Sequence, residues 1–132
     1  MNKNKGFTLI ELLITIVILG LLASIVAPEM FGKVGTAQRK TAASQMQSFE
    51  TAINTYRLDV GDFPENLSEL RLSDKKSWDG PYLPKSVPLD PWGTPYEYRV
   101  PGDNDNPFFL ASLGKDGKSG GEKDARDIIH QW

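Results

Sequence analysis

The stretch that decides the fold is residues 7–27, FTLIELLITIVILGLLASIVA. It carries one charged residue, Glu11, and residues 12–28 carry none. At ~1.5 Å rise per residue, a helix of this length reaches roughly 30 Å, which matches the hydrocarbon core of a bilayer. The sequence therefore predicts a membrane-spanning helix near the N-terminus.

A cleaved secretory signal is the alternative, because small residues occur at positions 23–27. A retained helix is favoured, since the apolar stretch exceeds the usual signal core of ~7–15 residues. It also contains Glu11, and a helical pattern continues beyond it. Lys3 and Lys5 precede the stretch and should stay in the cytoplasm, so the bulk of the chain should lie outside it.

Glu11 needs an explanation, because a carboxylate at the centre of a membrane helix costs roughly 2.5–3.5 kcal/mol. The cost is lower near a helix end, where the side chain can reach the interface. The residues leave two interpretations open: the carboxylate reaches the nearby cytoplasmic interface, or it pairs with a cation.

Beyond Pro28 the pattern becomes that of an amphipathic helix. We expect one helix over residues 7–58, with a kink or weakened turn at Pro28, which has no N–H to donate. The apolar stripe consists of Val34, Ala37, Ala42, Met46, Phe49, Ile53 and Tyr56.

The remaining residues, 59–132, are rich in proline and glycine and predict a small antiparallel sheet packed on that stripe, an α+β fold. A short helix should follow the N-cap Asn66, and residues 73–95 should form loops. Strands are expected at 96–100 and 108–113, with 128–132 as a third strand or a terminal pairing segment. The aromatic residues here are interpreted as packing residues: Trp78, Trp92, Tyr82, Tyr96, Phe108 and Phe109.

Composition excludes several classes of protein. With no cysteine, the chain forms no disulfide, thiolate metal site or lipidated cysteine. The balance of 15 basic and 17 acidic residues gives a charge of −2, which does not support nucleic-acid binding. The single histidine, His130, is interpreted as a surface or terminal packing residue, so an enzyme is not expected.

The C-terminal loop, residues 113–128, is the one site with recognisable chemistry. Asp116, Glu122, Asp124 and Asp127 share it with several glycines. Calcium prefers six to eight oxygen ligands, which carboxylates and carbonyls supply. The EF-hand pattern is absent, and nearby lysines and arginines offset the charge. The residues alone therefore favour a solvated acidic loop over a calcium site.

Two groups of motifs carry a family resemblance. Residues 6–14, GFTLIELLI, follow a short basic leader and resemble the class III signal of type IV pilins and type II secretion pseudopilins. Residues 80–85 (GPYLPK), 88–98 (PLDPWGTPYEY) and 112–117 (SLGKDG) resemble the major pseudopilin family of type II secretion. Major type IV pilins usually close their C-terminal region with a disulfide, which this chain cannot form.

The resemblance implies a type IV pilin-like fold and a processing scheme. A prepilin peptidase would remove the leader, residues 1–6, by cleaving between Gly6 and Phe7, and Phe7 would be N-methylated. Residues 7–28 would then be the transmembrane and filament-core helix, and residues 29–132 the periplasmic globular domain. Glu11 would pair with the Phe7 amine of a neighbouring subunit. An intrasubunit pair is also open, since the two residues are one helical turn apart.

The resemblance also implies a structural function and no enzymatic activity. Subunits would leave the bacterial inner membrane and form a homopolymer, the periplasmic pseudopilus, which exports folded proteins across the outer membrane. The implied partners are other pseudopilins, the inner-membrane assembly platform and the prepilin peptidase, with no nucleic acid. Two alternatives remain: a major or minor pilin of a type IV pilus, or a membrane-anchored periplasmic calcium-binding module.

Finally, the resemblance reverses the interpretation of the C-terminal loop, because major pseudopilins bind one calcium there. The cation would be held by three carboxylates and by main-chain carbonyls. The expected ligands are the side chains of Asp116, Asp124 and Asp127 and the carbonyls of Leu113, Lys118 and Gly121 or Glu122. The family usually has an acidic cluster before the isoleucine, which Ala125 and Arg126 interrupt here.

Overall fold

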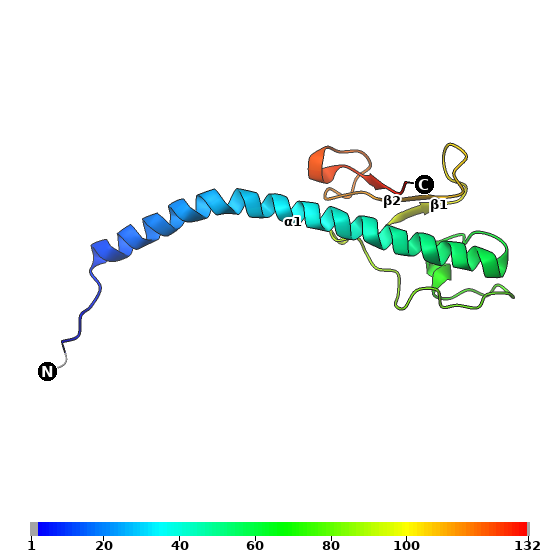
Figure 1. Cartoon of the computed structure of the whole chain (residues 1–132), viewed down its shortest axis with the longest axis horizontal. Coiled ribbons are helices and arrows are strands. Elements are labelled where there is room, and N and C mark those ends of the chain that lie inside the picture. Colours follow the sequence, from blue (N-terminus) through cyan, green and yellow to red (C-terminus); the bar gives the residue numbers. More distant parts are fainter. Residues whose placement is uncertain (1–2, 132) are drawn as a thin grey trace. The chain divides into compact units, whose positions relative to one another are not determined.

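The computed structural model describes residues 3–131, except for the side chain of Asp124. The elements are α1 (Leu9–Val60), η1 (Leu67–Leu70), β1 (Glu97–Arg99), β2 (Phe109–Ser112), η2 (Lys123–Ala125) and β3 (Ile128–Ile129) (Figure 1). Residue contacts divide the chain into two compact units, Met1–Gly35 and Thr36–Trp132. The combination of one long helix with a small antiparallel sheet confirms the predicted α+β class.

In the N-terminal unit, α1 presents its apolar side chains outward. It contains a stretch long and apolar enough to cross a bilayer, and none of that stretch is buried. The helix begins at Leu9 and continues through Pro28, so the kink or weakened turn expected at the proline does not end it. The hydroxyls of Thr15 and Ser24 donate to backbone carbonyls of α1 itself, at 2.8 Å and 2.7 Å. The hydroxyl groups of this stretch of α1 are thereby satisfied internally.

In the globular unit, the C-terminal part of α1 supplies one wall of the core. The predicted stripe is buried at Ala42, Met46, Phe49, Ile53 and Tyr56, each at most 1% exposed. Ala52 also lies in the core, because a stripe wider than the strict periodicity is covered here. The prediction was wrong for Val34 and Ala37, which are exposed.

The segment after α1 is largely irregular, as its prolines and glycines predict. Asn66 caps η1, since its side chain accepts a hydrogen bond from the Glu69 N–H at 3.3 Å. Leu67 and Leu70 of this short helix enter the core. Residues 73–95 contain no helix or strand, and Asp90 opens a turn in which the Gly93 N–H donates to the Asp90 carbonyl at 2.9 Å.

The sheet is an antiparallel meander of order β1-β2-β3. Tyr98 pairs with Leu110, and Ser112 pairs with Ile128. The expected third strand exists but is only two residues long, and Trp132 lies outside the described residues. The central strand β2 is buried from Leu110 to Ser112, so the polar groups at its end need partners inside the protein.

Aromatic side chains join the sheet and the loops to α1, as the packing interpretation predicts. Phe49 of α1 meets Tyr96 edge-on, with ring centroids 5.0 Å apart. Trp78 and Tyr82 make a similar contact at 5.7 Å. These contacts belong to one core cluster that holds the globular unit together.

Candidate functional site

The predicted cleavage point is accessible. Residues 3–8 are not helical, and the Gly6–Phe7 bond lies in this segment just before α1. The Phe7 side chain is 91% exposed, and no atom lies within 4 Å of the position where a Cβ of Gly6 would be. A peptidase would therefore meet a non-helical, uncovered backbone at this bond.

Glu11 is part of a capping box at the start of α1. Its Oε2 accepts a hydrogen bond from the Thr8 N–H at 3.1 Å, and its own N–H donates to Thr8 Oγ1 at 3.3 Å. Glu11 is therefore bonded to Thr8 rather than to the Phe7 amine that the sequence suggested as a partner. The signal was present as T-x-x-E before an apolar run.

The C-terminal loop folds tightly because several of its residues have positive φ. Gly114, Gly117, Gly120 and Gly121 have φ between 65° and 91°, and Lys123 has φ 52°. Gly114 also lies so close to the returning chain that an added Cβ would be 2.7 Å from the Arg126 carbonyl oxygen. The loop thus closes on itself at its base.

Asp116 and Gly121, both predicted calcium ligands, lie close together. Asp116 Oδ1 accepts the Lys118 N–H at 3.1 Å. Asp116 Oδ2 lies 3.2 Å from the position a Cβ of Gly121 would occupy. One carboxylate oxygen therefore shapes the backbone and the other faces Gly121.

Asp127 approaches the same turn from the other end of the loop. Its Oδ2 accepts the Gly120 N–H at 2.9 Å, and its N–H donates to the Gly120 carbonyl at 3.2 Å. Its Oδ1 is buried and has no hydrogen-bond partner among the residues that the structure describes. A buried carboxylate oxygen needs a partner, which a bound water or a cation can supply.

Apart from the Lys118 N–H, the other predicted ligands show no comparable contact with Asp116 or Asp127 among the described residues. Leu113 follows β2 and is half-buried, whereas Lys118 and Glu122 are exposed. The Glu122 carbonyl accepts the Ala125 N–H at 3.0 Å. The Asp124 side chain lies outside the described part of the chain. Within that part, no group of three His, Cys, Asp or Glu residues converges, so a cation here would need carbonyl ligands.

Two contacts that sequence reasoning missed fix this loop to the rest of the globular unit. The Arg39 guanidinium of α1 donates to the Arg126 carbonyl at 2.7 Å. At the base, the Ser112 hydroxyl donates to the buried Asp90 carboxylate at 2.7 Å. In each pair the two residues are far apart in the sequence, so no local sequence pattern predicts the contact.

His130 lies against the core. Its ring stacks on Phe108, with centroids 6.4 Å apart, and its Nε2 lies 3.2 Å from Glu50 Oε2 on α1. The side chain is only 10% exposed. The interpretation of His130 as a terminal packing residue is confirmed, and the residue ties the segment after β3 to α1.

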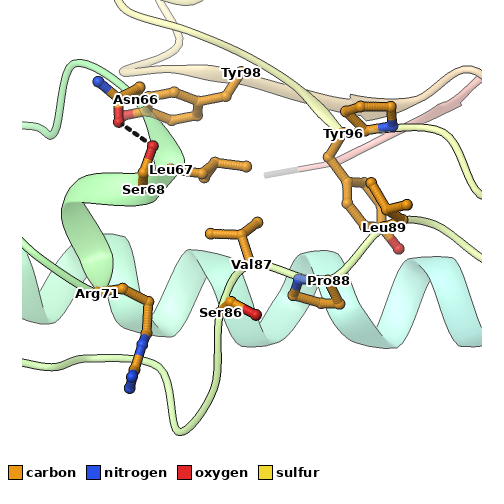
Figure 2. A pocket seen from close by; sticks show the side chains of 11 residues that line it. Asn66, Leu67, Ser68, Arg71, Ser86, Val87, Pro88, Leu89, Tyr96 and Tyr98 are labelled. Atoms are coloured by element: carbon orange, nitrogen blue, oxygen red, sulfur yellow. Dashed lines mark hydrogen bonds between the residues drawn. The ribbon is translucent and has the colours of Figure 1, made fainter.

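A groove of about 420 Å³ lies between η1 and the segment that follows residue 85 (Figure 2). Leu67, Val87 and Leu89 line it with Tyr96 and Tyr98. Burial raises the pKa of both tyrosines above its ordinary range, and the Asp90 carboxylate adds to the effect at Tyr96. Neutral phenols and aliphatic side chains make this groove chiefly apolar.

Comparison with known proteins agrees with both ends of the chain. A family model described as type II secretion system (T2SS), protein G matches residues 29–132. A second, described as prokaryotic N-terminal methylation motif, matches residues 1–27. The chain belongs to the type II secretion system protein G family. The resemblance noted in the sequence is thereby confirmed.

Individual members of the protein G family are similar over nearly the whole chain. The chain is 37% identical to type II secretion system core protein G of Pseudomonas aeruginosa, covering 96% of this chain and 94% of the relative. Identity to core protein G of Xanthomonas campestris pv. campestris is 39%, with coverages of 97% and 90%. The family assignment disfavours the alternative of a type IV pilus subunit.

A solved structure in this family shares the fold. It is the crystal structure of the major pseudopilin from the type 2 secretion system of enterohaemorrhagic Escherichia coli, at a TM-score of 0.59 and 27% identity. The match covers 77% of this chain and 93% of that chain. Together with the apolar helix, membership of the protein G family fits a membrane-anchored protein that faces the periplasm.

Proposed function

We propose that this protein G family member is a structural subunit that polymerises into the periplasmic pseudopilus of a type II secretion system. The filament would drive the export of folded proteins across the outer membrane. The observation that carries the proposal is the match of the globular region, residues 29–132, to protein G. Its partners would be further copies of this chain, other pseudopilins and the inner-membrane assembly platform.

Processing would precede assembly. A prepilin peptidase would cleave between Gly6 and Phe7, after which Phe7 would be N-methylated. The uncovered, non-helical backbone at this bond and the match of residues 1–27 to the methylation motif support this step. Lys3 and Lys5 would hold the leader in the cytoplasm, leaving a single-pass inner-membrane protein with its globular unit in the periplasm.

Glu11 would act in assembly through its charge. In the capping box its Oε2 accepts one N–H from Thr8, and an ionised carboxylate can accept further hydrogen bonds. The ammonium group of Phe7 in a neighbouring subunit would be a strong partner inside a filament core. In that core, burying an unpaired carboxylate would carry a large desolvation cost, and an ammonium partner would offset this cost.

The test is complementation of a strain that lacks the chain, with secretion and filament formation as readouts. The chain offers a sharp pair of variants at Glu11. Glu11→Gln retains the acceptor that caps the Thr8 N–H but removes the charge, and Glu97→Gln, on exposed β1, is the matched control. We expect Glu11→Gln to insert into the membrane and fail to form filaments, while Glu97→Gln assembles. Filaments from Glu11→Gln would reject the charge pairing, and wild-type chain that restores no secretion would reject the function.

We also propose that the C-terminal loop binds one calcium ion. The supporting observations are the buried Oδ1 of Asp127, which has no hydrogen-bond partner within the described part of the chain, and the Asp116 Oδ2 that faces Gly121. The ion would be held by the side chains of Asp116, Asp124 and Asp127 and by carbonyls of Leu113, Lys118 and Gly121 or Glu122. An all-oxygen donor set in a glycine-rich loop suits calcium.

When bound, the cation would neutralise the carboxylates and hold the two ends of the loop together. Titration of the full-length protein in detergent with calcium, followed by calorimetry, tests this directly. A saturable heat with calcium and none with magnesium is expected. The absence of any heat with calcium would refute the site.

A further inference from the structure

The end of β2 contains a buried polar pair that the packing of the core does not require. Asp90 is 4% exposed and Ser112 is 0% exposed. Asp90 Oδ1 accepts N–H groups from Trp92 at 3.1 Å and Thr94 at 2.8 Å, and its Oδ2 accepts the Ser112 hydroxyl at 2.7 Å. All three donors aim at one carboxylate, so its position is fixed from two segments of the chain.

The Ser112 oxygen has a second partner, which extends the chain of hydrogen bonds into the loop. It accepts the Gly114 N–H at 3.3 Å. That N–H belongs to the Leu113–Gly114 peptide, which is planar and trans. Within one trans peptide the N–H and C=O point in opposite directions. Holding the Gly114 N–H on Ser112 therefore turns the Leu113 carbonyl away from Ser112.

The same turn braces the loop a second time, beyond Asp116. An added Cβ on Gly117 would lie 3.2 Å from Thr94 Oγ1. Thr94 is also one of the residues whose N–H binds Asp90. The turn at residues 90–94 thus lies against the chain on both sides of Asp116, at Ser112 and at Gly117.

We infer that Asp90 and Ser112 are positioning residues for the calcium loop: they orient the Leu113–Gly114 peptide so that the Leu113 carbonyl serves as a metal ligand. The inference rests on the proposed calcium site. Neither side chain touches the cation. Groups that orient metal ligands through hydrogen bonds typically contribute 10–100-fold to metal affinity.

The test uses the full-length protein in detergent and calcium titration calorimetry. Ser112→Ala removes the hydroxyl that links the Asp90 carboxylate to the Gly114 N–H. Asp90→Asn places an amide donor where the Ser112 hydroxyl needs an acceptor. Tyr98→Phe is the matched control, because it removes a half-buried hydrogen bond, to the Pro64 carbonyl at 2.8 Å, outside the loop. We expect Ser112→Ala and Asp90→Asn to weaken calcium binding roughly 10–100-fold and Tyr98→Phe to leave the dissociation constant unchanged.

Each outcome has a separate meaning. A wild-type protein that does not bind calcium refutes the calcium proposal. Wild-type binding with unchanged affinity in Ser112→Ala refutes the positioning role, whatever happens to the melting temperature. If the variants do not fold, NMR of the wild type still decides. We expect the Gly114 amide to be protected from exchange in chelator and the Leu113 carbonyl carbon to shift when calcium is added, and an unmoved Leu113 resonance overturns the inference.

Discussion

Replacing Gly114 with alanine should destabilise the globular unit much more than the same replacement at Gly120. Both glycines have positive φ, 73° and 88°, and an alanine in this conformation costs about 1–2 kcal/mol. The surroundings differ. A Cβ at Gly114 would lie 2.7 Å from the Arg126 oxygen and 2.9 Å from the Ala125 oxygen, whereas one at Gly120 meets nothing within 4 Å.

The steric overlap adds about 1–3 kcal/mol at Gly114, the usual cost of forcing atoms into a filled space. The expected losses in unfolding free energy are therefore about 2–5 kcal/mol for Gly114→Ala and about 1–2 kcal/mol for Gly120→Ala. For a domain of this size each kcal/mol lowers the melting temperature by about 4–8 °C. Gly114→Ala should therefore melt at least about 4 °C below Gly120→Ala.

Thermal unfolding followed by tryptophan fluorescence measures this difference. Both variants are compared in excess chelator, so that only the fold of the loop is tested and calcium binding does not contribute. Equal melting temperatures for the two variants would show that the chain at Gly114 does not approach residues 125–126 as described. The backbone strain common to both variants cancels in the comparison.

Three further perturbations test other parts of the structure. Asp116→Ala should abolish the rise in melting temperature that calcium causes. For the wild type, this rise corresponds to about 2.7 kcal/mol of stabilisation when the calcium concentration is 100-fold above the dissociation constant. Equal wild-type melting curves in calcium and in chelator would contradict the prediction. Thr8→Ala should lose about 0.5–2 kcal/mol of local stability at the start of α1, seen as faster amide exchange there, while Thr41→Ala does not affect that turn. Burial, with the hydrogen bond to Glu69, raises the pKa of Tyr56 to about 12. The folded state therefore binds more protons than the unfolded one between about pH 10 and 12, so stability should fall as pH rises through this range, and Tyr56→Phe should reduce the slope measured by denaturant unfolding.

Much of the fold could be predicted because its signals are local. The apolar run and the stripe around Phe49 fix α1, since period and length are readable within a single segment. The capping residue Asn66 and the turn opened by Asp90 follow from side chains that bind their own neighbourhood. The exact strand ends differ, because pairing partners rather than propensity set them.

The candidate site was only partly predictable. Asp116 and Gly121 lie close together, but the contacts that fix the loop are not local. Ser112 is bonded to Asp90, 22 positions away, and Arg126 to Arg39, 87 positions away. One sequence carries no record of which distant polar groups meet. The capping box at Glu11 is different, because its pattern is readable in four consecutive residues, 8–11.

The internally bonded hydroxyls of Thr15 and Ser24 have a consequence for how the subunit moves. With those groups satisfied within α1, residues 12–28 of the helix present an almost purely hydrocarbon surface. Lipid tails and the side chains of neighbouring helices are nearly equivalent solvents for such a surface. When the helix leaves the bilayer and enters a filament, it moves from one apolar environment to another, so the transfer free energy of its apolar side chains changes little. The charge of Glu11, near the start of the helix, would then decide the direction of that exchange. One carboxylate would thus have a large effect on whether the subunit stays in the bilayer or enters a filament.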